Sequence, residues 1–252
     1  NLVESQPTET HSCNRIALCL TRSTAKRRAP TSHTARELVP CSQSYRQNLG
    51  GTLSRLERNW QYAEQYPNET DAQVQARRYS LELGIEPVSR AVAAQLSGLV
   101  AATAATSICE IGTGVGVSGL ALMRYAPEAT LTSIEIDPEH MRQARTIFAG
   151  AGVPNAQLRL IEGDASQVLS RLNLGAYDFV LIDADAARLL DYVELALQIV
   201  RPGGTIAVPS AFARGKVTDP AARDEVTQNM RDLLATVAES AAIAPVLSPA
   251  GD

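Results

Sequence analysis

Five short runs of almost continuously apolar residues follow one another along the chain from residue 108 onward. Each run is four to six residues long and has polar or glycine residues on either side. Runs of this kind are typical of strands that are covered on both faces of a sheet. The sequence therefore predicts strands at residues 108–111, 131–136, 158–161, 179–182 and 205–208.

Helical patterns lie between and before these runs. The predicted helices cover residues 71–83, 87–102, 117–125, 138–149, 165–172 and 187–200, and Arg201-Pro202-Gly203-Gly204 predicts a turn that ends the last of them. Strands that alternate with helices predict an α/β fold of the Rossmann-like type, with a mostly parallel sheet and helices on both faces. In such sheets a ligand binds beyond the carboxyl ends of the strands.

The first 54 residues have a different character. Between Thr10 and Arg36 the chain carries six basic residues and no acidic one, with many Ser and Thr. This composition predicts a disordered or dispensable basic extension, and a targeting or nucleic-acid-binding arm is the alternative. The predicted domains are therefore this extension, 1–54, and a folded domain, 55–252.

Bulk composition narrows the classes of partner. The net charge is −4, and no apolar stretch is long enough to cross a membrane. These values predict a cytoplasmic protein that binds neither nucleic acid nor membrane. Cys109 stands in the first apolar run, where a buried small side chain is expected.

The first predicted strand runs into Glu110-Ile111-Gly112-Thr113-Gly114-Val115-Gly116. Glycines there permit a tight turn and close approach of a ligand to the backbone. The dinucleotide fingerprint is G-x-G-x-x-G, whereas here the third glycine comes one residue early. An acid two residues before the first glycine suits a cationic sulfonium better than a pyrophosphate, so the loop favours S-adenosylmethionine over NAD.

Carboxylates follow the next strands. Glu135, at the end of the second strand, can accept hydrogen bonds from ribose hydroxyls. Asp164, after the third, either accepts from an adenine amino group or caps the helix that starts at Ala165. Asp183 and Asp185, after the fourth, suggest a metal ligand, a general base or a cofactor contact.

In combination, these motifs resemble the catechol and caffeoyl-CoA type O-methyltransferases, especially their small actinobacterial members. The resemblance covers about residues 55–252. It is carried by Cys109-Glu110-Ile111-Gly112-Thr113-Gly114-Val115-Gly116-Val117-Ser118, Ile134-Glu135-Ile136-Asp137-Pro138-Glu139-His140, Tyr177-Asp178-Phe179-Val180-Leu181-Ile182-Asp183-Ala184-Asp185, Asp191-Tyr192 and Arg201-Pro202-Gly203-Gly204.

The resemblance implies S-adenosylmethionine as cofactor and methyl transfer to a hydroxyl of a small acceptor. It implies cofactor contacts at Val88, Glu110, Gly112, Thr113, Ser118, Glu135 and Asp185, with Asp164 and Ala165 beside the adenine. Gly114 and Gly116 join this set as the remaining glycines of the loop. By analogy with the family, a homodimer is expected as well.

The chain departs from the metal-dependent members of that family. They carry a lysine after Asp-Ala-Asp and an Asp-Asn pair after the fifth strand, whereas this chain has Ala186, Pro209 and Ser210. Mg²⁺ prefers several hard oxygen ligands in an octahedral array, and Asp183 is the only matching one. A catalytic metal is therefore not expected.

Without a metal, a general base must take the proton of the acceptor hydroxyl. Asp183 is the predicted base, Lys216 is a weaker alternative, and His140 is expected at the surface or beside the cofactor. The departures leave a second hypothesis open, a S-adenosylmethionine-binding protein with lost or altered catalysis. A nicotinamide oxidoreductase is the third and is disfavoured by the glycine spacing.

The end of the chain predicts one more strand. Residues 244–247 fit the penultimate strand of this fold class, and Ser248-Pro249-Ala250-Gly251-Asp252 resembles the turn after it. The final antiparallel strand is then missing, and the domain is expected to be incomplete at its C-terminus. A sheet left in this state has an exposed edge.

Overall fold

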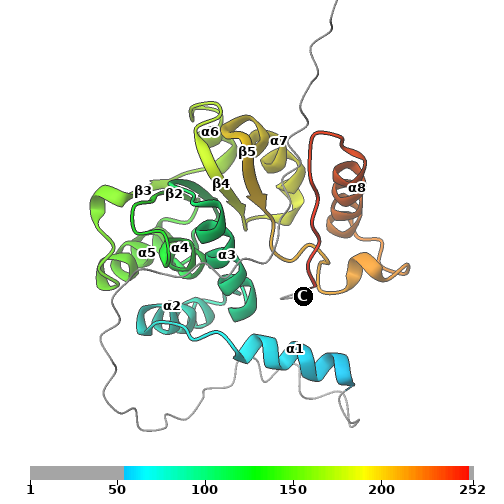
Figure 1. The fold of residues 1–252 in the computed structure, drawn as a ribbon, viewed down its shortest axis with the longest axis horizontal. Helices are drawn as coiled ribbons and strands as arrows, with labels where there is room; N and C mark the ends of the chain where they lie inside the picture. The colour runs from blue at the N-terminus through cyan, green and yellow to red at the C-terminus, as the bar shows by residue number, and fades with distance from the viewer. Residues whose placement is uncertain (1–53, 250–252) are drawn as a thin grey trace, which may run out of the picture. The chain divides into compact units, whose positions relative to one another are not determined.

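The computed structural model describes residues 54–249, so the predicted 1–54 extension lies outside the described residues except at Ser54. The five predicted strands are present as β1 (Ser107–Ile111), β2 (Thr130–Glu135), β3 (Leu158–Glu162), β4 (Tyr177–Ile182) and β5 (Val200–Ala207). In the described part of the chain they form one parallel sheet in the order β3-β2-β1-β4-β5 (Figure 1). The prediction of a parallel α/β fold is confirmed.

Helices cover both faces of this sheet. The described helices are α1 (Arg55–Gln65), α2 (Asp71–Glu82), α3 (Arg90–Thr103), α4 (Val117–Met123), α5 (Pro138–Gly150), α6 (Ala165–Leu169), α7 (Leu189–Ile199) and α8 (Glu225–Glu239). Short 3₁₀ turns are η2 (Asn155–Gln157), η3 (Ala186–Arg188) and η4 (Lys216–Thr218). None of the helices in residues 54–249 could cross a membrane.

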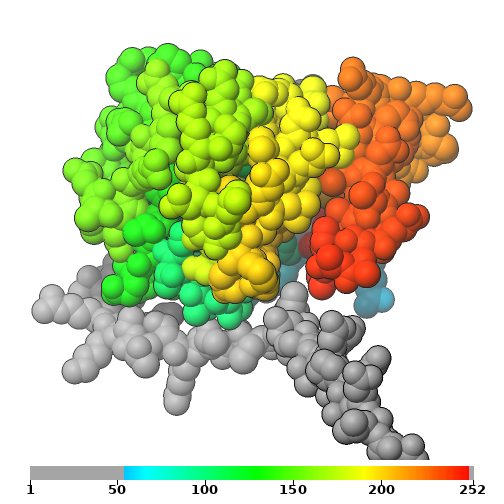
Figure 2. All heavy atoms as spheres, turned by 90° about the horizontal axis from the view of Figure 1, so that it is seen from above, coloured from blue at the N-terminus to red at the C-terminus, as the bar shows by residue number. Residues whose placement is uncertain are grey.

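Two apolar cores lie on opposite faces of the sheet, because side chains alternate along each strand. Ile108 and Phe179 belong to the core that α2, α3, α4 and α5 cover. Cys109 and Val180 belong to the core that α6, α7 and α8 cover. Figure 2 shows α8, in orange to red, beside the yellow segment that contains α7. The carboxyl ends of the strands lie between the two helix layers, and a ligand site can form there.

Most of the described α-helices begin after a residue whose side chain caps them; α4 and α7 do not. Ser54 and Thr70 form capping boxes with Glu57 and Gln73 at the starts of α1 and α2. Ser89 caps α3, which therefore begins at Arg90 and not at Pro87 as predicted. Residues 85–88 are left without regular structure as a result.

Two predictions about the last elements are wrong. The predicted helix 187–200 is split into η3 and α7, and Val200 already belongs to β5, which includes the expected turn residues Arg201-Pro202-Gly203-Gly204. Pro202 is tolerated because β5 is an edge strand and its pairing with β4 shifts register there. Residues 244–247 form no strand, and nothing in the described part of the sheet pairs with them.

Candidate functional site

A cavity of about 360 Å³ opens at the carboxyl ends of β1, β2 and β4, the place that the parallel topology predicts for a ligand. Backbone hydrogen bonds hold these strand ends together. Gly112 N donates to Ile134 O at 2.9 Å, and Asp183 N donates to Ile111 O at 2.8 Å. The apolar part of the lining includes Ile85, Pro87, Val88, Val115, Ile136 and Tyr192.

The glycine loop needs its glycines for two different reasons. Gly112, Gly114 and Gly116 have φ angles of 90°, 51° and 95°, in the region that disfavours side chains. At Gly112 there is also no space, since a Cβ would lie 2.0 Å from the Asp183 carbonyl oxygen. Gly116 instead caps α4 and lies against the Phe148 ring.

Hydrogen bonds to the Glu135 carboxylate hold the glycine loop at the end of β2. Its Oε2 accepts from Gly114 N at 2.8 Å, and its Oε1 accepts from Asp137 N at 3.0 Å. His140, in the first turn of α5, places its Nδ1 3.8 Å from Glu135 Oε1. Glu135 and His140 both line the cavity, so the pair presents a carboxylate and an imidazole on one wall.

Glu110 lies beneath the loop and does not line the cavity. Its side chain is fully buried, and Ser133 Oγ donates to Glu110 Oε2 at 2.5 Å. Thr113 Oγ1 lies 2.5 Å from the same Ser133 hydroxyl. Glu110 Oε1 has no hydrogen-bond partner. Desolvation raises the pKa of this carboxyl to about 7, and hydrogen bonds from Ser118 and Ser133 offset only part of the effect.

This burial predicts a pH-dependent stability. A carboxyl whose pKa rises from 4.5 to about 7 on folding destabilises the fold by about 3 kcal/mol once the pH exceeds 7, and not at all below 4.5. Glu110→Gln removes this titration. We expect the difference in melting temperature, variant minus wild type, to be larger at pH 8 than at pH 5. Thermal unfolding at both pH values measures this, and a pH-independent difference would contradict it.

Asp183 follows β4 directly and faces the cavity. It is half-buried, and desolvation raises the pKa of its carboxyl to about 6. A carboxylate with this pKa is a suitable general base near neutral pH. The alternative base, Lys216, is exposed, pairs with Asp224 at 3.5 Å and does not line the cavity.

Asp164 caps α6, as one of its two interpretations predicted, with Oδ1 accepting from Ser166 N at 2.9 Å. The other oxygen accepts from Arg188 Nη1 at 2.7 Å. The Arg188 guanidinium also lies 5.4 Å from the centre of the Tyr192 ring. Arg188 and Tyr192 line the cavity, whereas Asp164 does not.

The structure thus brings most of the predicted site residues into one cavity. Those that line it are Val88, Gly112, Thr113, Gly114, Ser118, Glu135, Ala165, Asp183 and Asp185. Glu110, Gly116 and Asp164 lie behind the lining and support it. Cofactor contact by the other eleven residues, and catalysis by Asp183, stay predictions.

Sequence reasoning missed part of the lining. Ile85, Glu86, Arg188 and the role of Tyr192 were not predicted. Ile85 and Glu86 gave no signal, because irregular backbone has no periodicity to recognise. Arg188 gave no local signal either, because its partner Asp164 is twenty-four positions away in the sequence.

The oxygen ligands around Asp183 do not fit a catalytic divalent cation. Asp185 is exposed and caps η3, with Oδ1 accepting from Ala187 N at 3.0 Å. Pro209 and Ser210 offer no carboxylate after β5. Within residues 54–249 no three His, Cys, Asp or Glu side chains gather as a metal-binding group.

The topology and the cavity place the chain among doubly wound α/β proteins that bind a ligand where the strand order reverses, between β1 and β4. The chain belongs to the O-methyltransferase family, whose model matches residues 65–252.

Relatives and solved structures agree with this assignment. A protein of Mycobacterium avium (strain 104), named as a candidate O-methyltransferase, is 40% identical over 200 residues, which is 79% of this chain and 90% of that protein. The O-methyltransferase TomG from Streptomyces achromogenes, solved in complex with SAM, is 28% identical with a TM-score of 0.67 and covers 75% of this chain and 89% of its own. The SAH-bound methyltransferase PaMTH1 from Podospora anserina is 25% identical with a TM-score of 0.67 and covers 80% and 95%.

Proposed function

We propose that the protein transfers a methyl group from S-adenosylmethionine to a hydroxyl of a small acceptor, without a catalytic metal. One observation carries this proposal: the glycine loop, Glu135 and Asp183 line the same cavity at the carboxyl ends of three parallel strands. The family match over residues 65–252 supports residues 55–252 as the catalytic domain.

The charge of the cavity fits this cofactor. Four carboxylates line it, from Glu86, Glu135, Asp183 and Asp185. Glu86 is paired with Arg214, and the one arginine of the lining is paired with Asp164, so Glu135, Asp183 and Asp185 give the lining its acidic character. An acidic lining favours a cationic sulfonium and disfavours a pyrophosphate. The volume of about 360 Å³ lies within the range of small-ligand sites. The fit therefore supports S-adenosylmethionine over NAD.

Roles for individual residues follow from their positions. Backbone groups of residues 112–114 and the Glu135 carboxylate bind and orient the cofactor, with Glu135 accepting from ribose hydroxyls. When bound, S-adenosylmethionine supplies the electrophilic methyl group. The Asp183 carboxylate would take the proton of the acceptor hydroxyl, whose oxygen would receive the methyl group, leaving S-adenosylhomocysteine. Apolar walls from Val88 and Ile136 exclude water from this region.

Isothermal titration with S-adenosylhomocysteine and with NAD tests the cofactor. We expect a binding signal with S-adenosylhomocysteine and none with NAD, and binding of NAD alone would contradict the proposal.

A panel of phenols, with and without Mg²⁺ and a chelator, then tests the acceptor. Turnover that survives chelation is expected, and activity abolished by the chelator would contradict the metal-free mechanism.

Glu135→Gln should weaken the binding of S-adenosylhomocysteine by roughly 10- to 100-fold, the equivalent of one hydrogen bond to a charged group. Glu162→Gln is the matched control, because Glu162 is the register partner of Glu135 on β3 but is exposed and outside the cavity. Titration calorimetry on both variants measures the effect. Equal losses in the two variants would refute the role of Glu135.

The acceptor is expected to be a small molecule. A homodimer, a cytoplasmic location and the absence of a nucleic-acid partner stay predictions.

A further inference from the structure

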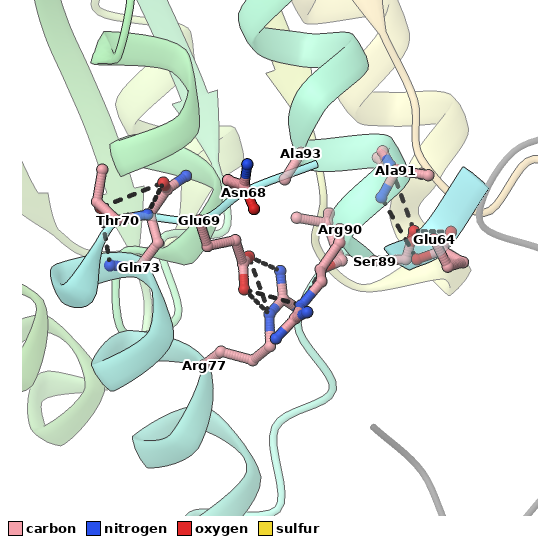
Figure 3. Close-up of polar contacts among 12 residues, drawn as sticks. Glu64, Asn68, Glu69, Thr70, Gln73, Arg77, Ser89, Arg90, Ala91 and Ala93 are labelled. Atoms are coloured by element: carbon pink, nitrogen blue, oxygen red, sulfur yellow. Dashed lines mark hydrogen bonds and ion pairs between the residues drawn. The ribbon is translucent and has the colours of Figure 1, made fainter. Parts of the chain in front are cut away.

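A group of three charged side chains lies among the helices that precede the sheet; Glu69 and Arg77 are buried, and Arg90 is partly exposed. Arg77 on α2 donates from Nε to both carboxylate oxygens of Glu69 at 3.1 Å and from Nη2 to Oε1 at 2.5 Å (Figure 3). Arg90 Nε lies 3.1 Å from Glu69 Oε2. The Glu69 and Arg77 side chains are only 3% and 7% exposed. Buried charges persist only when they are paired and hydrogen-bonded, so this arrangement is closely constrained.

The remaining donor of Arg77 connects this group to the cavity. Arg77 Nη1 donates to the Val88 carbonyl oxygen at 2.6 Å. The Val88 side chain is buried and lines the cavity, together with its neighbours Glu86 and Pro87. Because the guanidinium is planar and its donors are fixed relative to one another, orienting it on Glu69 also orients the Val88 carbonyl.

The segment that Arg77 holds has little other support from regular structure. Residues 85–88 belong to no helix or strand. At one end Ser80 Oγ donates to Ile85 O at 3.0 Å. At the other end Glu64 on α1 accepts from Ser89 Oγ at 2.7 Å and from Ala91 N at 3.3 Å (Figure 3). Side chains from α1 and α2 therefore place this cavity wall, and Arg214, in the segment after β5, adds an ion pair with Glu86.

We infer that Glu69 and Arg77 are positioning residues for the cofactor: their buried ion pair holds the Val88 carbonyl and so fixes residues 86–88 against the bound S-adenosyl group. This inference rests on the proposed function. Neither side chain lines the cavity, so each acts through residues 86–88. Arginine is required because lysine, with a single ammonium centre, does not span Glu69 and the Val88 carbonyl in a fixed geometry.

Two variants test the inference. Arg77→Lys keeps the positive charge but loses the several donors that the guanidinium holds in a fixed geometry. Glu69→Gln keeps the side-chain shape but removes the negative charge that orients Arg77. Both should raise the Kd for S-adenosylhomocysteine and the KM for S-adenosylmethionine by roughly tenfold, with kcat and the KM for the acceptor little changed. Arg78→Ala is the control, because Arg78 lies on the same helix but pairs with Glu82 at the surface. Its constants should match those of wild type.

A merely structural role has a different signature. It would lower the folded fraction, and thus kcat, while the Kd of the folded protein stayed at its wild-type value. Unchanged Kd values in whichever variant folds would overturn the inference. Arg77→Lys is the milder variant, because Glu69→Gln leaves Arg77 and Arg90 without their shared carboxylate. A wild-type protein that binds no S-adenosylhomocysteine would overturn the proposed function and the inference together. Wild-type binding with unchanged variants overturns the inference alone.

Discussion

Replacing Gly112 by alanine is expected to destabilise the protein by about 3 kcal/mol or more and to abolish cofactor binding. The new Cβ would lie 2.0 Å from the Asp183 carbonyl oxygen and 2.7 Å from its carbonyl carbon. The backbone also has a φ of 90°, which side chains disfavour. The ends of β1 and β4 must therefore separate, and Asp183 moves with them. Thermal unfolding and calorimetry with S-adenosylhomocysteine measure the two losses.

Two other glycines separate these effects. Gly114→Ala places an alanine at a φ of 51°, but its Cβ meets nothing closer than Ile85 Cγ2 at 3.8 Å. It should therefore lose only the stability that the unfavourable φ costs, without a steric clash. Gly98→Ala, in α3 with open space around it, should stabilise the protein by about 0.5–1 kcal/mol. A Gly112→Ala variant with the melting temperature and affinity of wild type would show that the strand ends are not in close contact.

The sheet was predictable because its signals are local. The buried strands are continuous apolar runs, and residues that follow them, such as Glu135 and Asp183, lie at one edge for topological reasons. Strand alternation also explains why Glu110 is not in the cavity. Its side chain lies on the same face as Ile108, beneath α4, where Gly119 approaches its Oε2. An acid before the glycine loop therefore supports the loop from behind.

The unpredicted features depend on contacts between distant segments. Arg77 reaches Val88 across eleven positions, and Glu64 reaches Ala91 across twenty-seven. No periodicity or motif encodes such pairs, since each depends on how α1, α2 and α3 pack. The strand expected at 244–247 is absent for a different reason: its local pattern is suitable, but it has no partner in the described part of the sheet. Its apolar residues fit a strand, but a strand also needs a partner, and in residues 54–249 none pairs with it.

Asp183→Asn should lower kcat by about 10²–10⁴-fold while S-adenosylhomocysteine binds nearly as in wild type, because only proton transfer is lost. The raised pKa of Asp183 defines the pH dependence: its carboxylate is the active form, so wild-type kcat should fall as the pH drops below about 6 and level off above it. The residual activity of Asp183→Asn should not show this fall with decreasing pH. A phenol that the wild type methylates serves for the measurement.

Asp191→Asn provides the control for this variant. Asp191 is an exposed carboxylate in the first turn of α7 and lies outside the cavity, so its substitution should leave kcat and the pH profile unchanged. If Asp183→Asn retained the wild-type kcat, another group would have to accept the proton. His140 is then the next candidate, since it lines the same cavity beside Glu135. A pH step that persisted in Asp183→Asn and disappeared in His140→Gln would identify it.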